Sequence, residues 1–221
     1  MGRLALAVGS SFLGDEASLP ADGAVLLQRH GLDSYTPPHL IDNRANLASL
    51  ADAGCDRVLA ISSVGSLRAE LPVGTLVCPD DFIALQLGTS AYDDSRGHRV
   101  PGFDPAWRAQ VVRDWKRHVS APLRDGGVYW QAIGPRFETP AEIRLIAAHA
   151  DLIGMTVAGE AIVAGELGLR YAAVCAVDNL ANGIGAEPLT PAAYEAGRKA
   201  NQKTLHEALE QLIPRLVEGP A

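Results

Sequence analysis

Apolar runs of strand length alternate along the chain with stretches in which apolar residues recur at helical spacing. Residues 4–8, 24–28 and 171–177 are continuous apolar runs, and small or polar residues follow each of them. The segment 43–53 has apolar residues on one helical face, and Gly54 follows it. Further strands are expected over 57–62, 75–78, 128–133 and 152–153, and further helices over 105–118, from Thr139, after Thr156 and from Thr190 onward.

This alternation predicts an α/β fold with a largely parallel sheet. No internal repeat, low-complexity tract or linker interrupts the pattern, so a single domain is expected over residues 1–221. The segment 87–105 has little periodicity, and a loop of that length in a compact domain is usually functional or mobile.

Polar side chains gather directly after the expected strands. In open α/β sheets, ligands bind beyond the carboxyl ends of the strands. Arg29 and His30 together offer a forked cation and a titratable donor, which suits phosphate, although a solvated pair explains them equally well. The candidate residues at or near strand ends are Ser10, Ser11, Arg29, His30, Ser62, Ser63, Phe137, Glu138, Met155, Thr156, Asp178 and Asn179.

Composition and charge exclude several classes of partner. The net charge of −7 and the pI of about 5.3 argue against nucleic-acid or anionic-membrane binding, because both need a basic face. Cys55, Cys78 and Cys175 are expected to be buried and reduced, as in a cytoplasmic protein, and no metal-ligand spacing is present. The apolar N-terminal run is too short to span a membrane and is expected to form the first strand.

Three long segments resemble the trimeric purine nucleoside phosphorylase and methylthioadenosine phosphorylase family. They are residues 29–83, beginning RHG and including VGSLR and PVGTLVCPDDFI, then GPRFETPAEIRLI from Gly134, and GMTVAGEAIVAGELGLRYAAVCAVDN through Asn179. The resemblance implies one α/β domain with a distorted mixed sheet, assembled as a homotrimer. It also implies a pentosyltransferase of purine salvage that cleaves a nucleoside with phosphate, giving free base and pentose 1-phosphate. Phosphate is then a co-substrate, and neither a metal nor an organic cofactor is expected.

The resemblance also implies a role for each candidate residue. Phosphate would be held by Ser11, Arg29, His30, Ser63 and Thr156, the ribose by Met155 and Thr156, and the base by Phe137, Glu138, Asp178 and Asn179. The catalytic residues would be Asn179, Glu138 and His30.

Glu138 and Asn179 favour a 6-oxopurine such as hypoxanthine or guanine. A carboxylate can accept from the N1–H of a 6-oxopurine, whereas adenine presents N1 as an acceptor and would leave both groups unpaired. An amide at residue 179 can donate to N7, where charge develops as the glycosidic bond breaks. Without the family, Glu138 is an ordinary carboxylate in a first helical turn and Asn179 a turn residue.

Several positions depart from the family pattern and leave alternatives open. Asp178 replaces the usual Ser or Thr beside the base-binding Asn. Relatives that recognise a 5′-hydroxyl carry His near residues 190–194, where this chain has none, so a 5′-methylthio nucleoside is an alternative substrate. Ser34 and Asn43 stand where His and Tyr are common, so a nucleosidase using water and a catalytically inactive binding protein are further alternatives. His98 in the long loop is a candidate to reach a neighbouring subunit.

Overall fold

Two long neighbouring strands form the middle of the sheet. In the computed structural model, which describes residues 2–13, 19–32 and 34–218, strand β3 (Cys55–Ser66) runs parallel to β9 (Arg170–Leu180) along almost its whole length. The side chains of both strands are almost all buried, which explains their near-continuous apolar sequence. The other strands are β1 (Arg3–Val8), β2 (Ala24–Gln28), β4 (Leu76–Cys78), β5 (Asp81–Ile83), β6 (Leu123–Asp125), β7 (Val128–Gln131) and β8 (Leu152–Gly154).

The described residues form one nine-stranded mixed sheet. Its main path is β5-β7-β8-β3-β9-β4-β6, and β1 pairs with the first half of β3 and carries β2 on its other edge. The pairs β3–β8 and β4–β9 are antiparallel, and the remaining pairs are parallel. The mixed, mostly parallel sheet that the sequence and the resemblance predicted is therefore confirmed.

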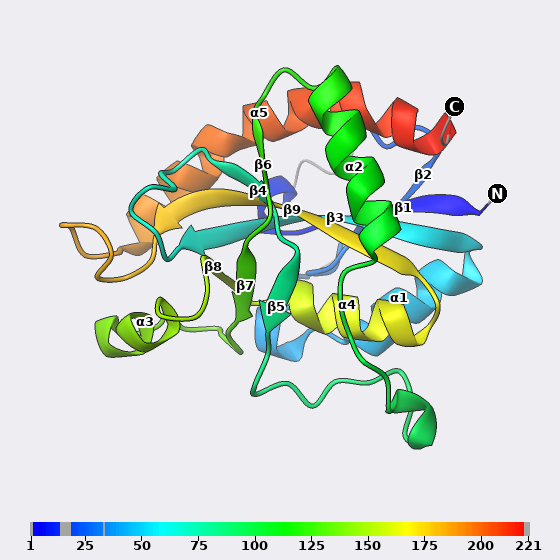
Figure 1. Cartoon of the computed structure of the whole chain (residues 1–221), viewed down its shortest axis with the longest axis horizontal. Coiled ribbons are helices and arrows are strands. Elements are labelled where there is room, and N and C mark those ends of the chain that lie inside the picture. Colours follow the sequence, from blue (N-terminus) through cyan, green and yellow to red (C-terminus); the bar gives the residue numbers. More distant parts are fainter. Residues whose placement is uncertain (1, 14–18, 33, 219–221) are drawn as a thin grey trace.

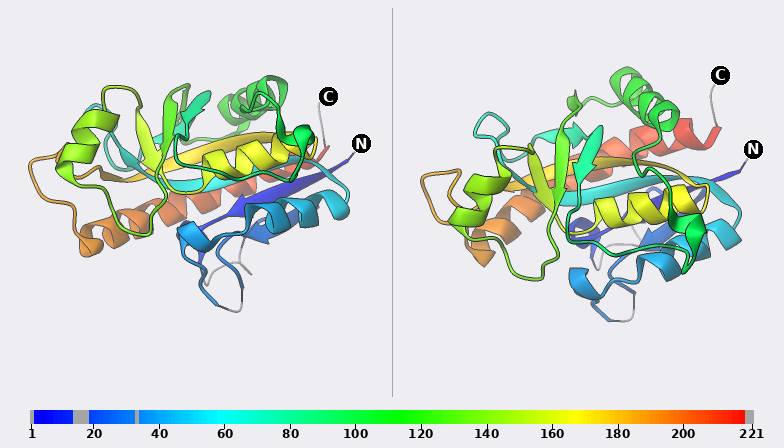
Figure 2. Two further views of the ribbon diagram at one scale, coloured as in Figure 1. Left: turned by 90° about the horizontal axis from the view of Figure 1, so that it is seen from below. Right: turned by 60° about the horizontal axis from the view of Figure 1, so that its bottom comes forward.

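Helices cover both faces of the sheet (Figures 1 and 2). Helices α1 (Asn43–Asp52) and α4 (Val157–Glu166) pack on one face, and α2 (Pro105–His118) and α5 (Pro191–Glu218) pack on the other. The period of two along β1 and β9 divides their side chains between these layers, so Tyr171 and Ala173 face α4 while Ala172 and Val174 face α2 and α5. Within the described part of the chain, no helix is long and apolar enough to cross a membrane.

The short helix α3 (Pro140–Ile146) confirms a local sequence signal. Thr139 accepts the backbone N–H of Glu142 at 3.2 Å, and the Glu142 carboxylate accepts the backbone N–H of Thr139 at 2.7 Å. This reciprocal capping box fixes where the helix begins. It thereby also fixes the loop before it, residues 132–139, which carries Phe137 and Glu138.

The strand expected over residues 57–62 is longer in the structure and also includes residues 63–66. Strand β3 continues through these residues to Ser66, and β9 continues through Asp178 and Asn179 to Leu180. The two backbones stabilise each other by continuing their hydrogen-bonded ladder, which small or polar side chains do not prevent. The short strands β5 and β6, three residues each, were also not predicted.

One irregularity interrupts the pairing of β3 with β9. Val64 pairs with Val177, but the next residue, Gly65, pairs with Asn179, so Asp178 is an extra residue in β9. Such a bulge bends the strand and redirects the side chains around it, and bulges are common beside active sites.

Helix α5 lies unusually close to this bulge at Gly197. A Cβ added to Gly197 would lie 1.7 Å from the backbone carbonyl oxygen of Asp178, so only a glycine permits the observed distance. Asn201, one turn further along α5, donates from Nδ2 to the carbonyl oxygen of Val177 at 2.9 Å. The helix is thus packed directly against the backbone of the bulge.

We expect Gly197→Ala to destabilise the protein by roughly 1–3 kcal/mol or more, because the clash is with backbone that cannot rotate away. The matched control is Gly165→Ala in α4, where an added Cβ meets nothing within 4 Å. This control should stabilise the protein by about 0.5–1 kcal/mol through its effect on chain entropy. Urea unfolding of both variants measures the difference, and equal effects would contradict the close contact of α5 with β9.

Candidate functional site

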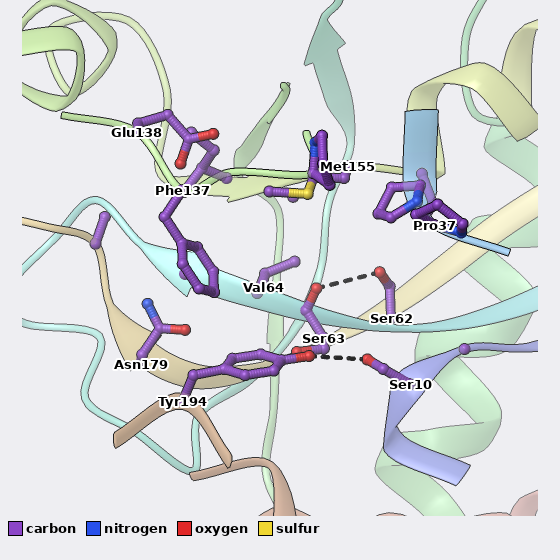
Figure 3. Close-up of a pocket in the computed structure, with 18 of the residues that line it drawn as sticks. Ser10, Pro37, Ser62, Ser63, Val64, Phe137, Glu138, Met155, Asn179 and Tyr194 are labelled. Carbon is purple, nitrogen blue, oxygen red and sulfur yellow. Dashed lines mark hydrogen bonds between the residues drawn. The ribbon is translucent and has the colours of Figure 1, made fainter. Parts of the chain in front are cut away.

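A cavity of about 400 Å³ opens where the ends of β1, β3, β8 and β9 meet the start of α5. This volume falls within the range of small-molecule sites. Figure 3 shows the side chains that surround it, which come from segments far apart in the sequence. The lining residues are Gly9, Ser10, Arg29, His30, Tyr35, Pro37, Pro38, Ser62, Ser63, Val64, Gly65, Pro135, Phe137, Glu138, Ile153, Gly154, Met155, Thr156, Asn179, Ala181, Asn182, Leu189, Pro191 and Tyr194.

Phe137 and Glu138 enter the cavity from the loop between β7 and α3. The Phe137 ring is tilted against the Tyr194 ring, with 5.6 Å between their centres, so two aromatic faces border the same space. The backbone carbonyl of Glu138 accepts from Asn182 Nδ2 at 3.1 Å, which ties this loop to the segment after β9. Burial raises the pKa of the Glu138 carboxyl, and the nearby Glu142 charge adds to that shift.

Asn179 lies in the same wall, on the strand β9. Its side chain is 8% exposed and donates from Nδ2 to the carbonyl oxygen of Leu180 at 2.9 Å. An amide carries two N–H groups and a carbonyl oxygen, so the second N–H and Oδ1 remain available to a ligand. Gly65 leaves room for this amide, since an added Cβ would lie 3.1 Å from Asn179 Nδ2.

Met155 and Thr156 lie between β8 and α4, in the middle of the cavity wall. Gly134 passes directly beside Met155, and its positive φ of 73° together with an added Cβ 2.5 Å from Met155 Sδ requires glycine there. Thr156 is the N-cap of α4, but its side chain makes no capping hydrogen bond. The Thr156 hydroxyl is therefore not used to cap the helix.

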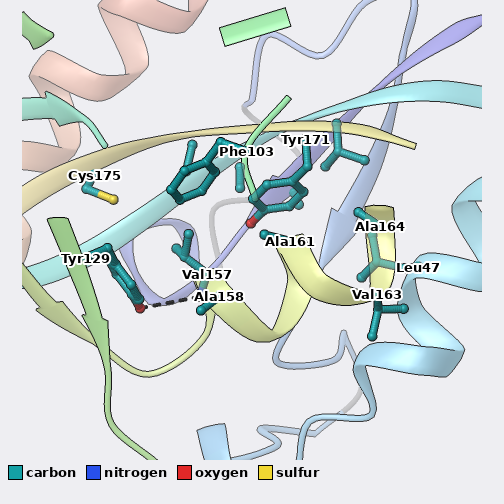
Figure 4. Close-up of a cluster of buried hydrophobic side chains, with 14 of the residues drawn as sticks. Leu47, Phe103, Tyr129, Val157, Ala158, Ala161, Val163, Ala164, Tyr171 and Cys175 are labelled. Atoms are coloured by element: carbon teal, nitrogen blue, oxygen red, sulfur yellow. Dashed lines mark hydrogen bonds between the residues drawn. The ribbon is translucent and has the colours of Figure 1, made fainter. Parts of the chain in front are cut away.

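Neighbouring side chains satisfy the first backbone N–H groups of α4 instead. The Tyr129 hydroxyl oxygen, seen in Figure 4 beside the start of this helix, accepts from the backbone N–H groups of Thr156 and Val157 at 3.2 and 3.3 Å. Gln131 Oε1 accepts from the N–H groups of Ala158 and Gly159 at 2.6 and 3.0 Å. The helix N-terminus is thus already saturated, and Thr156 can contribute its hydroxyl group to a ligand.

Arg29 lines the cavity, but its charge is compensated by a buried partner. Its guanidinium forms an ion pair with Glu160 in which both side chains are 1% exposed, and Tyr171 donates to Glu160 Oε2 at 2.6 Å. Nη1 donates to the carbonyl of Ile61 at 2.8 Å and Nη2 to that of Ala7 at 3.2 Å. Burial disfavours the charged guanidinium, yet the Glu160 carboxylate outweighs it, and the pKa of Arg29 is raised.

His30 is oriented by a bond to its own loop. Its Nδ1 donates to the backbone carbonyl of Thr36 at 2.8 Å, because a carbonyl oxygen can only accept, and the ring stacks on Tyr35 at 5.0 Å. The neutral ring therefore presents Nε2 as an acceptor, and only the protonated ring offers a donor there. Burial lowers the pKa of His30, which favours the neutral form at neutral pH.

The first loop presents Ser10, rather than Ser11, to the cavity. Ser10 Oγ is 3.0 Å from the Tyr194 hydroxyl oxygen, and the backbone carbonyl of Ser10 accepts from Arg198 Nη1 at 2.7 Å. Ser11 is 2% exposed, does not line the cavity, and its Oγ has no hydrogen-bond partner among the described residues. The sequence placed Tyr194 near the 5′ end of a substrate by alignment, but nothing in it indicated the contact with Ser10.

Asp178, expected in the base wall, lies outside the cavity lining. Its Oδ2 accepts from the Ser63 hydroxyl, and its Oδ1 accepts from Asn201 Nδ2 at 2.6 Å. Although the two residues are adjacent, Asn179 lines the cavity, whereas the Asp178 carboxylate contacts Ser63 and Asn201. Asp178 therefore lies behind Ser63, which does line the cavity.

Most of the candidate residues line the same cavity. The cavity brings together Arg29, His30, Ser63, Phe137, Glu138, Met155, Thr156 and Asn179. His98 lies apart from them, in the loop before α2. In the described ranges, no group of three or more His, Cys, Asp or Glu side chains is placed to hold a metal ion.

The geometry suits an elongated ligand. One end has a carboxylate, an amide and an aromatic ring, which can recognise a planar heterocycle with its own donors and acceptors. The other end has hydroxyl groups and a histidine beside a compensated arginine, which can hold a polar or anionic group.

Comparison with known proteins places this geometry in a family. A family model described as the phosphorylase superfamily matches residues 17–214. A "probable 6-oxopurine nucleoside phosphorylase" from Archaeoglobus fulgidus is 39% identical over 193 residues, covering 87% of this chain and 79% of that protein. A "probable S-methyl-5′-thioinosine phosphorylase" from Xanthomonas campestris is 36% identical over 202 residues, with the same two coverages of 87% and 79%.

Solved structures share the fold. A methylthioadenosine phosphorylase from Schistosoma mansoni in complex with adenine superposes with a TM-score of 0.85, covering 100% of this chain and 93% of that one. The two sequences are 20% identical, so this likeness concerns the architecture.

Proposed function

The chain belongs to the phosphorylase superfamily, and we propose that it cleaves the N-glycosidic bond of a 6-oxopurine nucleoside with phosphate. Free base and pentose 1-phosphate are the products, which makes the protein a pentosyltransferase. The observation that carries this proposal is that Glu138 and Asn179 lie in one cavity together with Phe137.

Glu138 and Asn179 match the edge of a 6-oxopurine. Glu138 accepts from N1–H, and the free N–H of Asn179 donates to N7 while the base stacks on Phe137. Adenine has no N1–H, so its N1 would face the carboxylate acceptor to acceptor, at a cost of about 1–3 kcal/mol. The relatives support this choice, since 6-oxopurine nucleosides and thioinosine both carry a 6-oxo base.

The reaction follows from where charge develops. As the bond between C1′ and N9 stretches, its electron pair moves onto the purine and the sugar becomes cationic. Asn179 stabilises the negative charge at N7, and phosphate below C1′ stabilises the cation and then forms the new C–O bond. Ser10, Ser63, Thr156, Arg29 and His30 surround the anion, and Met155 packs against the ribose.

A 5′-methylthio group is the second candidate for the 5′ substituent. Leu189, Pro191, Pro37 and Pro38 give part of the cavity wall an apolar surface, which suits a thioether better than a hydroxyl group. The Xanthomonas campestris relative carries this substituent in its substrate name. A water-using nucleosidase is a further alternative, because Arg29 offers the anion a charge that Glu160 already compensates.

The proposal extends to the setting of the enzyme. We propose a cytoplasmic homotrimer acting in purine salvage, with phosphate as co-substrate and neither metal nor organic cofactor. Exposed apolar side chains support association between copies, since Leu40 is 63% and Leu85 79% exposed.

A substrate panel tests the proposed reaction. Inosine, adenosine and their 5′-methylthio analogues are incubated with and without phosphate, and base and sugar products are separated. We expect hypoxanthine release to need phosphate and to yield a sugar 1-phosphate, with the inosine compounds faster than their adenosine counterparts. Equal rates without phosphate, free sugar as the product, or faster adenosine cleavage would each contradict the proposal.

Glu138 should also set part of the pH dependence. The ionised carboxylate is a stronger acceptor for N1–H than the protonated acid, so kcat/KM for inosine should fall as the pH decreases through the raised pKa of Glu138. Glu138→Ala should lower kcat/KM for inosine by about 5- to 150-fold, the equivalent of about 1–3 kcal/mol.

Glu138→Gln is the matched control for this pH dependence. It keeps an acceptor oxygen for N1–H and does not titrate, so it should retain more activity than Glu138→Ala and lose this part of the pH profile. An acid limb unchanged in Glu138→Gln would assign the titration to another group, such as His30, which both proteins share.

A further inference from the structure

The Ser63–Asp178 pair occupies the boundary between the cavity and the bulge of β9. Ser63 lines the cavity, whereas Asp178 is 1% exposed and lies behind it, between β3 and α5. The Ser63 hydroxyl donates to Asp178 Oδ2, and Asn201 Nδ2 donates to Asp178 Oδ1 at 2.6 Å. Both carboxylate oxygens therefore have a defined partner.

The direction of the single Ser63 O–H bond determines whether Ser63 can donate a hydrogen bond to a ligand in the cavity. A serine hydroxyl has a single hydrogen, and here that hydrogen is directed to Asp178. The Ser63 oxygen consequently presents only lone pairs to a ligand. An anion such as phosphate also presents lone pairs, so the pair as observed opposes anion binding at this point.

The nearby positive charges do not compensate for this unfavourable contact between Ser63 and an anion. Arg29 is paired with Glu160, and Arg198 of α5 is paired with Glu195 at 2.6 Å and donates to the Ser10 carbonyl. The neutral His30 presents an acceptor at Nε2. An ionised Asp178 would therefore add an uncompensated negative charge directly behind the anion end of the cavity.

We propose that Asp178 is a positioning residue that links anion binding in the cavity to the uptake of one proton. When Asp178 is protonated, its Oδ2–H donates to Ser63 Oγ, and the Ser63 hydroxyl turns to donate to the anion. Asn201 continues to donate to Oδ1 in both states, which directs the proton to Oδ2. This inference rests on the proposed function, in which that anion is the phosphate co-substrate.

The surroundings of Asp178 keep its protonated state accessible. Burial raises the pKa of this carboxyl, although the bonds from Ser63 and Asn201 oppose the shift. The charged groups that act on it are Arg198, which lowers its pKa, and Glu195, which raises it, both on α5. A bound anion adds a further negative charge and must raise the pKa again, so binding and protonation favour each other.

The direction of the pH dependence follows. Below the pKa of Asp178 in the free protein, the residue is protonated with or without the anion, and affinity is constant. Between that pKa and the higher pKa of the complex, affinity falls by up to about tenfold for each pH unit. Above the pKa of the complex, affinity is constant and weak.

Calorimetric titration with sulfate tests this linkage. Sulfate keeps its charge over the working pH range, unlike phosphate, so any pH dependence belongs to the protein. Titrations in two buffers with different ionisation enthalpies report the protons taken up on binding. We expect the wild-type protein to bind sulfate more weakly as the pH rises and to take up a proton in the interval where affinity falls.

Asp178→Asn is the matched variant, because its amide can donate to Ser63 and accept from Asn201 as the protonated acid does. At low pH, Asp178→Asn should bind sulfate at least as tightly as the wild type does. The pH dependence of its sulfate affinity that comes from Asp178 should disappear, and only the part that comes from His30 should remain. Ser63→Ala keeps Asp178 but lacks the hydroxyl, and should bind sulfate more weakly at low pH. Thermal melting confirms that both variants are folded.

Several outcomes would overturn the inference. Parallel pH curves for the wild type and Asp178→Asn, weaker sulfate binding by Asp178→Asn at every pH, or no sulfate binding by the wild type at any pH would each do so. The proposed function is judged separately, by phosphate-dependent cleavage of inosine. Cleavage of inosine together with parallel pH curves for sulfate binding would refute only the linkage of anion binding to protonation of Asp178. That linkage without cleavage of inosine would refute only the proposed function.

Discussion

The pairing of β3 with β9, and the extra residue within it, is the constraint on which the site depends. Val64 pairs with Val177 and Gly65 with Asn179, which leaves Asp178 between them without a partner residue in β3. Asn179 lines the cavity, and Asp178 lies behind Ser63 and contacts α5. Shifting that register by one residue would exchange an amide for a carboxylate in the wall of the cavity.

Recognition in this cavity rests on the direction of hydrogen bonds more than on net charge. The strongest cation beside it, Arg29, is held in a buried pair with Glu160 that also binds the backbone of β1 and β3. In a buried ion pair, the free-energy cost of desolvating both charges offsets much of their attraction. What distinguishes one ligand from another is then the fixed set of donors and acceptors at Glu138, Asn179, Ser63 and His30.

Much of the fold follows from local sequence signals, but the details of the site do not. The bounds of β2 and α2 match the predicted ones, and the capping box at Thr139 was readable from its spacing. The extension of β3 and β9 past polar residues depends on pairing between strands over a hundred residues apart in sequence, which local signals do not contain. For the same reason, the contacts of Asp178 with Ser63 and Asn201 and the contact of Tyr194 with Ser10 were not predicted.

The most direct measurement is the ratio of kcat/KM for inosine to that for adenosine in Asn179→Asp and Asp178→Asn, compared with the wild type. These substitutions at adjacent residues exchange an amide and a carboxylate, at Asn179 in the cavity lining and at Asp178 outside it. We expect Asn179→Asp to shift the ratio toward adenosine by about 5- to 150-fold, the equivalent of about 1–3 kcal/mol, and Asp178→Asn to leave it unchanged. A shift of the ratio in Asp178→Asn, with none in Asn179→Asp, would show that Asp178 contacts the base and would contradict the assignment of base recognition to Asn179.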